Sequence, residues 1–216
     1  YEDVLCEFNN FKMREKYIIS NNSKIKGESL ETRNWEIIKE KSIPLNDQLD
    51  AKSRFEFINN DSNQAIIMLG NQTCSRRSCE YLPLKILESY LSYGMSGALF
   101  KLFREKNGIT YDLGVFNPIR RMNAPFLVYF SVSNNNAIFA FDLLTSLWKN
   151  LLLHQLNDND LYLAKEKLKG SFLLGNQSLD GILQRKLQLI SYGISSISEI
   201  DLNSKIDEIS SIDILE

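Results

Sequence analysis

Arg104 and Tyr111 are two hydrogen-bond donors seven residues apart that could act on one carbonyl group. Arg104 lies near the end of a predicted helix, and Tyr111 follows the turn expected at Asn107 and Gly108. From there a guanidinium and a phenol can converge on a backbone carbonyl and stabilise a developing oxyanion. In an arbitrary protein, such side chains are more often a surface ion pair and a ring packed at a sheet edge.

The chain has too few suitably spaced metal-ligating residues for a hydrolytic metal centre of its own. A catalytic zinc needs three protein ligands, an open position for water and usually a glutamate base. The chain has one histidine, His154, which follows an apolar run and is expected to border the core and bond a backbone group. Cys74 and Cys79 are too far apart in sequence for a zinc knuckle. We expect them at a strand end and a helix start, where the sequence neither requires nor excludes a disulfide between them. We therefore expect no metal or cofactor in this chain.

Other catalytic arrangements are not supported either. His154 has no nucleophile elbow with which to form a Ser-His-Asp triad. Gly94 and Gly97 precede a predicted helix, but the P-loop lysine and the dinucleotide fingerprint are both missing.

The composition is that of a globular protein, and its nearly balanced charge does not favour a highly charged binding partner. The chain has 216 residues, 25 basic and 27 acidic side chains and a formal net charge of -2, which argues against nucleic acid. No apolar run approaches the roughly 20 residues of a membrane span. The three cysteines are too few and too odd in number for a disulfide framework. The compartment stays open, with the cytoplasm as the default.

Apolar periodicity predicts strands followed by helices. Residues 126–133 alternate between apolar and more polar side chains, which is typical of a sheet with one wetter face. We expect strands at 55–58, 64–69, 110–117 and 126–133, and helices at 79–92, 96–106, 137–155 and 179–192. Asp158 or Asp160 is expected to cap a further helix between the last two. This order favours an α+β fold, with a largely antiparallel sheet packed against helices.

Two stretches at the start of the chain differ from the rest. Residues 1–20 read as a helix followed by a short strand, and residues 21–52 lose periodicity and read as a linker. Residues 53–216 are expected to form one domain.

Residues 91–111 resemble part of the C-terminal domain of the insulinase/pitrilysin zinc-peptidase family. The pattern of its C-terminal domain is close to GGGMSSRLFxxLREKxGLAY. Residues 157–170 are similar to a second family helix, LTxEELExAKxxLKG, and the likeness spans residues 53–215. Gly97-Ala98 and Thr110 depart from the pattern. The matching residues are Gly94, Met95, Ser96, Leu99, Phe100, Arg104, Glu105, Lys106, Gly108 and Tyr111.

The resemblance implies a processing-peptidase-like metallohydrolase fold in which two similar α+β domains enclose a peptide. One bears zinc on an inverted His-x-x-Glu-His motif, and the other bears the Arg/Tyr pair. This chain would then be the non-catalytic half. Arg104 and Tyr111 would bind an extended peptide, which adds to a sheet edge, and zinc and base would come from another domain or subunit in a dimer.

Two further expectations accompany this one. Glu2–Leu5 resembles Ile212–Leu215, as if both began the closing helix of successive similar domains, so residues 1–20 would be the tail of a preceding domain and the chain would continue past Glu216. The alternative function is a structural scaffold or a peptide-binding subunit with no proteolytic role.

Overall fold

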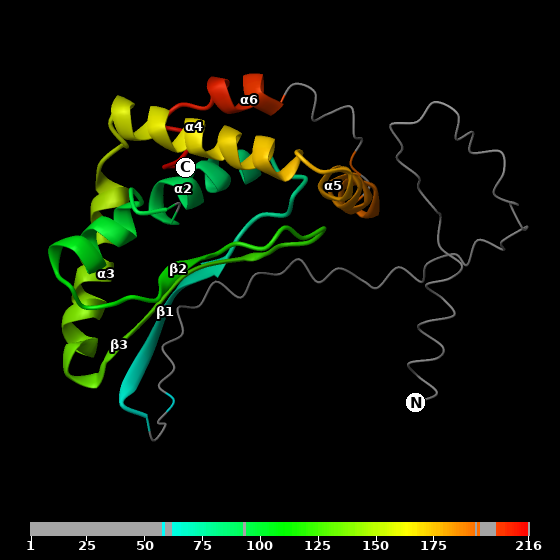
Figure 1. Ribbon diagram of the computed structural model, residues 1–216. Coiled ribbons are helices and arrows are strands. Elements are labelled where there is room, and N and C mark those ends of the chain that lie inside the picture. Colours follow the sequence, from blue (N-terminus) through cyan, green and yellow to red (C-terminus); the bar gives the residue numbers. More distant parts are fainter. Residues whose placement is uncertain (1–57, 59–61, 93, 193, 195–201, 216) are drawn as a thin grey trace, which may run out of the picture.

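The computed structural model describes residues 58, 62–92, 94–192, 194 and 202–215 (Figure 1). The predicted domain tail at 1–20, the linker at 21–52 and nearly all of the strand at 55–58 lie outside these residues. The described elements are β1 (Gln64–Gln72), α2 (Tyr81–Ser92), the π-helix η2 (Phe100–Lys106), β2 (Leu113–Phe116), β3 (Pro125–Ser133), the 3-10 turn η3 (Asn134–Asn136), α3 (Ala137–Leu153), α4 (Asp158–Gly175), α5 (Leu179–Ser191) and α6 (Leu202–Glu208).

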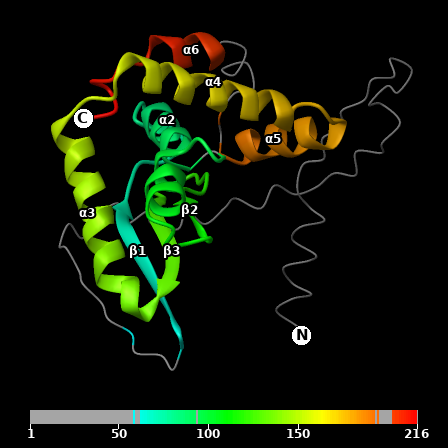
Figure 2. The same ribbon diagram turned by 60° about the vertical axis from the view of Figure 1, so that its left-hand side comes forward.

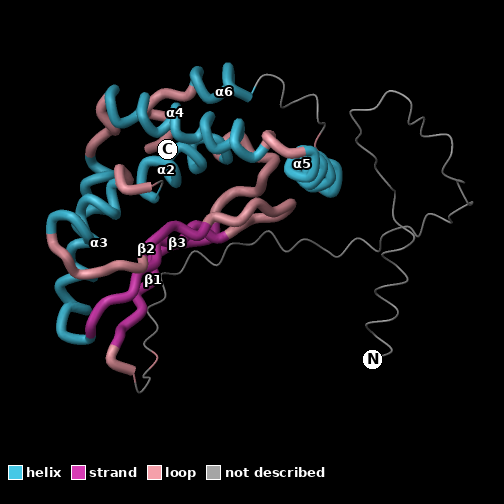
Figure 3. The backbone as a smooth tube through the Cα atoms, viewed as in Figure 1, coloured by secondary structure: helices cyan, strands magenta, loops and turns pink. Residues whose placement is uncertain are grey.

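The three described strands form one antiparallel sheet in the order β1-β3-β2 (Figure 3). Along β3, buried and half-buried residues alternate, and Phe126, Val128, Phe130 and Val132 are the buried ones. The sheet therefore has one core face, as its period of two predicts. The α+β class with an antiparallel sheet is confirmed.

Helix α2 lies between two apolar clusters. On one side, the sheet, η2 and α3 enclose a cluster that includes Leu91, Phe103 and Phe130. On the other side, α2 packs against α4 and α6 around Ile86 and Leu168. Figure 2 shows α6, α4 and α2 in succession above the sheet, with α3 running along its side. This layering holds the sheet and η2, which carry the candidate site, against a rigid backing.

Several boundaries differ from the predictions. The helix expected at 96–106 is a π-helix over Phe100–Lys106, and the strand expected at 110–117 is limited to Leu113–Phe116. Asn157, rather than Asp158 or Asp160, caps α4, because its side-chain oxygen accepts the Asp160 amide at 2.8 Å. Residues 211–215 form turns, where the beginning of a helix was expected. Helix α6 was not predicted.

None of the described helices is both long and apolar enough to cross a membrane.

Candidate functional site: an arginine and a tyrosine beside a sheet edge

The structure places the Arg104 guanidinium beside two aromatic rings. Its central carbon lies 5.2 Å from the centre of the Tyr111 ring and 4.9 Å from that of the Phe100 ring. Arg104 is exposed, and Tyr111 keeps 83% of its surface in contact with solvent. A guanidinium that stacks on rings keeps its N–H groups in its own plane, where they can still donate to another acceptor.

The end of η2 determines where Arg104 lies. The Arg104 carbonyl accepts the amides of Asn107 and Gly108, and the Phe103 carbonyl accepts the Ile109 amide at 3.0 Å. Gly108 has a φ of 61°, a left-handed conformation that glycine adopts without steric cost, and ends the helix as predicted. The turn brings the chain back toward the sheet, so Tyr111 comes to lie next to Arg104.

Phe103 anchors η2 to the core side of the sheet. Its side chain is fully buried, and its ring centre lies 4.7 Å from that of Phe130 on β3. Arg104 is therefore the neighbour in sequence of a side chain that is packed into the core. π-helical turns are rare and occur often at functional sites, so this departure from α-helical geometry supports a functional role for the segment.

Thr110 anchors the tyrosine from the other side. It is buried, and its hydroxyl lies 2.6 Å from the Ser131 carbonyl oxygen and 3.0 Å from that of Asp112. The Ser131 amide in turn donates to the Asp112 carbonyl at 3.0 Å. Sequence reasoning treated Thr110 as a minor departure from the family pattern. Its hydroxyl instead bonds the carbonyls of Asp112 and Ser131, which lie opposite each other just before the β2–β3 ladder begins.

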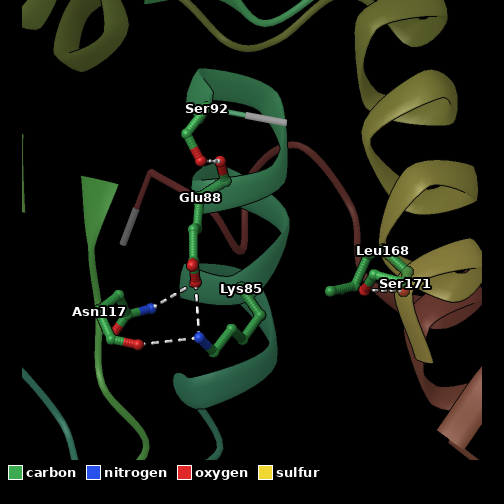
Figure 4. A network of polar contacts seen from close by, with 6 residues as sticks. All are labelled: Lys85, Glu88, Ser92, Asn117, Leu168 and Ser171. Atoms are coloured by element: carbon green, nitrogen blue, oxygen red, sulfur yellow. Dashed lines mark hydrogen bonds and ion pairs between the residues drawn. The ribbon is translucent and has the colours of Figure 1, made fainter. Parts of the chain in front are cut away.

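A buried ion pair holds the far end of β2 (Figure 4). The Lys85 ammonium on α2 lies 2.6 Å from the Glu88 carboxylate and 3.0 Å from the Asn117 carbonyl, just after β2. The Asn117 side-chain amide donates to the same Glu88 oxygen at 3.0 Å. Sequence reasoning missed this network. The available signal was a lysine and a glutamate three residues apart on a helix with apolar residues between them.

No group of three or more metal-ligating side chains comes together among the described residues. His154 does not border the core as predicted. It is exposed just past the end of α3, and its backbone amide donates to the Asn150 carbonyl at 2.9 Å. The helix ends at Leu153, two residues before the predicted end, so His154 lies outside it and does not follow the helical spacing of the core-facing leucines.

Cys74 and Cys79 are free thiols in the loop between β1 and α2, rather than at a strand end and a helix start. Cys74 is half-buried and lines a cleft of about 500 Å3, together with Glu80 and Asp213. Burial raises the pKa of the Cys74 thiol, and the negative charge of Glu80 acts in the same direction.

We expect alkylation of Cys74 to require a higher pH than alkylation of an ordinary cysteine. A raised pKa means less thiolate, the reactive form, at any given pH. The measurement is the rate of reaction with iodoacetamide against pH in the Cys6→Ser/Cys79→Ser variant, where Cys74 is the only thiol. Glu80→Gln should shift the profile part of the way back, and Glu105→Gln should not. A profile like that of a free cysteine would contradict the described burial.

Comparison with known proteins gives consistent matches. A family model described as the peptidase M16 inactive domain matches residues 15–168. An uncharacterized zinc protease of Rickettsia felis is 26% identical over 125 residues, which are 57% of this chain and 30% of that protein. A second uncharacterized zinc protease, from Streptomyces coelicolor, is 25% identical over 135 residues, or 62% of this chain and 29% of that one. The chain thus spans about 30% of the length of these curated relatives.

Solved structures show the same fold. A peptidase M16 inactive domain from Pseudomonas fluorescens has a TM-score of 0.65 and 19% identity, and the match covers 71% of this chain and 37% of that one. An inactive peptidase domain from Bordetella parapertussis has a TM-score of 0.60 and 10% identity, with 73% of this chain and 86% of that one covered.

Proposed function

Because this chain belongs to the family of the peptidase M16 inactive domain, which confirms its resemblance to the insulinase/pitrilysin peptidases, we propose that it holds the substrate of a zinc metalloendopeptidase. In this proposal, Arg104 and Tyr111 bind the backbone of an extended peptide. Zinc and the general base come from a complementary domain or subunit, with which the chain forms a dimer-like pair.

The observation that carries the proposal is the exposed, anchored Arg104–Tyr111 pair. Arg104 has no ion-pair partner among the described residues, so its N–H groups are available to a ligand. Each residue comes directly after a buried residue in the sequence: Arg104 after Phe103, and Tyr111 after Thr110. Donors whose positions are determined before binding stabilise a developing oxyanion without a reorganisation cost.

The division of labour follows from the chemistry of zinc hydrolysis. Zinc would supply the activated water and polarise the scissile carbonyl in the complementary domain. The residues of this chain would hold the peptide and donate hydrogen bonds to its carbonyl groups. We place this role in residues 53–216, with residues 21–52 as a linker and residues 1–20 as the tail of a preceding domain.

Substitution of the pair tests the proposal. We expect Arg104→Ala and Tyr111→Phe each to lower kcat/KM by about 100-fold, since removing one such donor costs about 3 kcal/mol in the transition state. The measurement uses the full-length protein, with and without a zinc-motif subunit, and a fluorogenic library of unfolded peptides. Arg120→Ala and Tyr162→Phe are matched controls, because both side chains are exposed and lie on other elements.

The outcomes separate the alternatives. Zinc-dependent cleavage that neither substitution affects would show that the Arg/Tyr assignment is wrong. Peptide binding that depends on both residues, without bound zinc or cleavage under any pairing, would identify a peptide-binding subunit. If the protein neither binds nor cleaves peptides, a structural scaffold takes the place of the proposal.

A further inference from the structure

We propose that Asn107 is a positioning residue for the Arg104–Tyr111 pair, because its side chain fixes the turn that brings Tyr111 beside the Arg104 guanidinium. The proposal rests on the proposed function and deepens it, since it identifies a residue outside the pair on which the placement of both donors depends. Asn107 acts through the backbone of the turn and does not itself contact the peptide.

The carbonyl of Leu102 is bonded by a side chain where a helix would use its backbone. In a π-helix, each carbonyl accepts the amide five residues later, which for Leu102 is the backbone amide of Asn107. That amide donates to the Arg104 carbonyl instead. The Asn107 side chain takes its place, and its Nδ2 donates to the Leu102 carbonyl at 2.7 Å. The side chain thus supplies the next bond of the helix while the backbone leaves it.

This exchange decides which bonds the Arg104 carbonyl receives. It accepts the amides of Asn107 and Gly108, the second at 3.1 Å, and these two bonds end η2 in a tight turn. Without the side-chain amide, the backbone amide of residue 107 is drawn back to Leu102, because both residues are half-buried and water replaces the lost bond poorly. The Arg104 carbonyl then loses one of its two bonds, and the path from Gly108 to Tyr111 shifts.

The contact between Arg104 and Tyr111 depends on this turn, because the two residues lie on either side of it. Both side chains are exposed, so burial of their own does not hold them in place. The buried Phe103 and Thr110 fix the two ends of the segment, and the Asn107 bond fixes the turn between them. A displacement of about 1 Å can cost a catalytic group about 100-fold in rate.

Asn107→Ala tests the positioning without reference to activity. Aromatic rings shield nuclei that lie over their faces, so the Arg104 Nε–H resonance should carry a shift from the rings of Phe100 and Tyr111. We expect Asn107→Ala to move this resonance toward its position in Tyr111→Leu. The measurement is NMR of the full-length protein with 15N-labelled arginine. An unchanged Arg104 resonance in the folded variant would overturn the proposal.

Asn157→Ala is the matched control for the loss of an asparagine bond at a helix end. Asn157 caps α4, and its side-chain oxygen accepts the Asp160 amide at 2.8 Å. Both alanine variants should lower the midpoint of thermal unfolding by about 2–4 °C. Only Asn107→Ala should move the Arg104 resonance. Equal movement in both would mean that Arg104 responds to stability in general, which contradicts a positioning role.

A double-mutant cycle separates positioning from a merely structural role. In the cleavage assay described above, we expect Asn107→Ala to lower kcat/KM by about tenfold in the otherwise wild-type protein. In the Arg104→Ala background the further loss should be below about threefold, because the contact that the turn serves is already gone. Losses of equal size in both backgrounds would refute the positioning role.

Two further readouts apply if Asn107→Ala fails to fold. Asn107→Asp keeps the size of the side chain but cannot donate to a carbonyl at neutral pH, and it should move the Arg104 resonance in the same way. In the wild-type protein, one Nδ2 proton of Asn107 should exchange with solvent more slowly than those of the exposed Asn135. Equal exchange would contradict the bond on which the proposal stands.

The failure of this proposal and that of the proposed function give different results. If Arg104→Ala and Tyr111→Phe lower kcat/KM while Asn107→Ala changes neither kcat/KM nor the Arg104 resonance, only the role of Asn107 is wrong. If Asn107→Ala moves the resonance but Arg104→Ala cleaves as well as the wild type, the positioning stands and the proposed function fails.

Discussion

Phe103→Ala will lower the free energy of unfolding by about 4 kcal/mol, because the substitution leaves a cavity where a fully buried ring packs against Phe130. The loss includes the transfer of the ring out of the core and the cost of a cavity that the rigid neighbours cannot fill. Urea denaturation followed by circular dichroism measures it. We expect peptide binding to fall as well, because Arg104 follows Phe103 directly and depends on it for its position.

Two controls distinguish this core effect from a general sensitivity to substitution. Phe103→Leu keeps most of the apolar volume and should cost about 1.5 kcal/mol. Phe139→Ala removes a ring that is 49% exposed on α3 and should cost a small fraction of the Phe103→Ala loss. A loss below about 1 kcal/mol for Phe103→Ala would contradict the described packing of η2 against β3.

Lys85→Met will lower the free energy of unfolding by about 3 kcal/mol, because it leaves the Glu88 carboxylate largely buried without its cation. The Lys85 and Glu88 side chains are only 8% and 13% exposed, so water can replace little of the lost interaction. The Asn117 carbonyl also loses its bond from Lys85, so of the two bonds that attach Asn117 to α2 only the one from its side-chain amide to Glu88 remains. Urea denaturation again gives the measurement.

The double variant Lys85→Met/Glu88→Gln isolates the cause. It removes both charges, and replacing a whole buried pair is often nearly neutral, so it should recover most of the loss. Lys169→Met is the surface control: Lys169 pairs with Glu166 and with Asp207, whose side chain is 59% exposed, and should cost below about 1 kcal/mol. If the double variant is as unstable as Lys85→Met, the loss comes from packing rather than from the unpaired carboxylate.

The peptide-binding role that we propose for Arg104 and Tyr111 would depend on the same two anchors. Phe103 holds η2 and Arg104 at one end of β2, and Lys85 holds Asn117 at the other. A variant that keeps its stability but loses binding therefore identifies a contact with the peptide. A variant that loses both identifies a support.

The sequence by itself determined the features that local patterns encode. The alternation in residues 126–133 predicted a strand with one core face, because side chains on a strand point to opposite sides in turn. Helical spacing predicted the positions of α2, α3, α4 and α5, and Gly108 predicted the end of the helix that carries Arg104. The spacing of Arg104 and Tyr111, within a block that resembles a known family, was enough to identify the candidate pair.

Only the tertiary structure decided the features that depend on contacts between distant residues. The π-helical form of η2 accompanies the packing of Phe103 against Phe130, 27 residues later, and no local pattern predicts it. Burial of Lys85 depends on Glu88 and on the Asn117 carbonyl, and the hydroxyl of Thr110 is significant only because Ser131 lies beside it. The pairing of Leu113 with Phe130 and of Val115 with Val128 depends on the register between β2 and β3, and a shift of one residue would turn every β2 side chain to the opposite face.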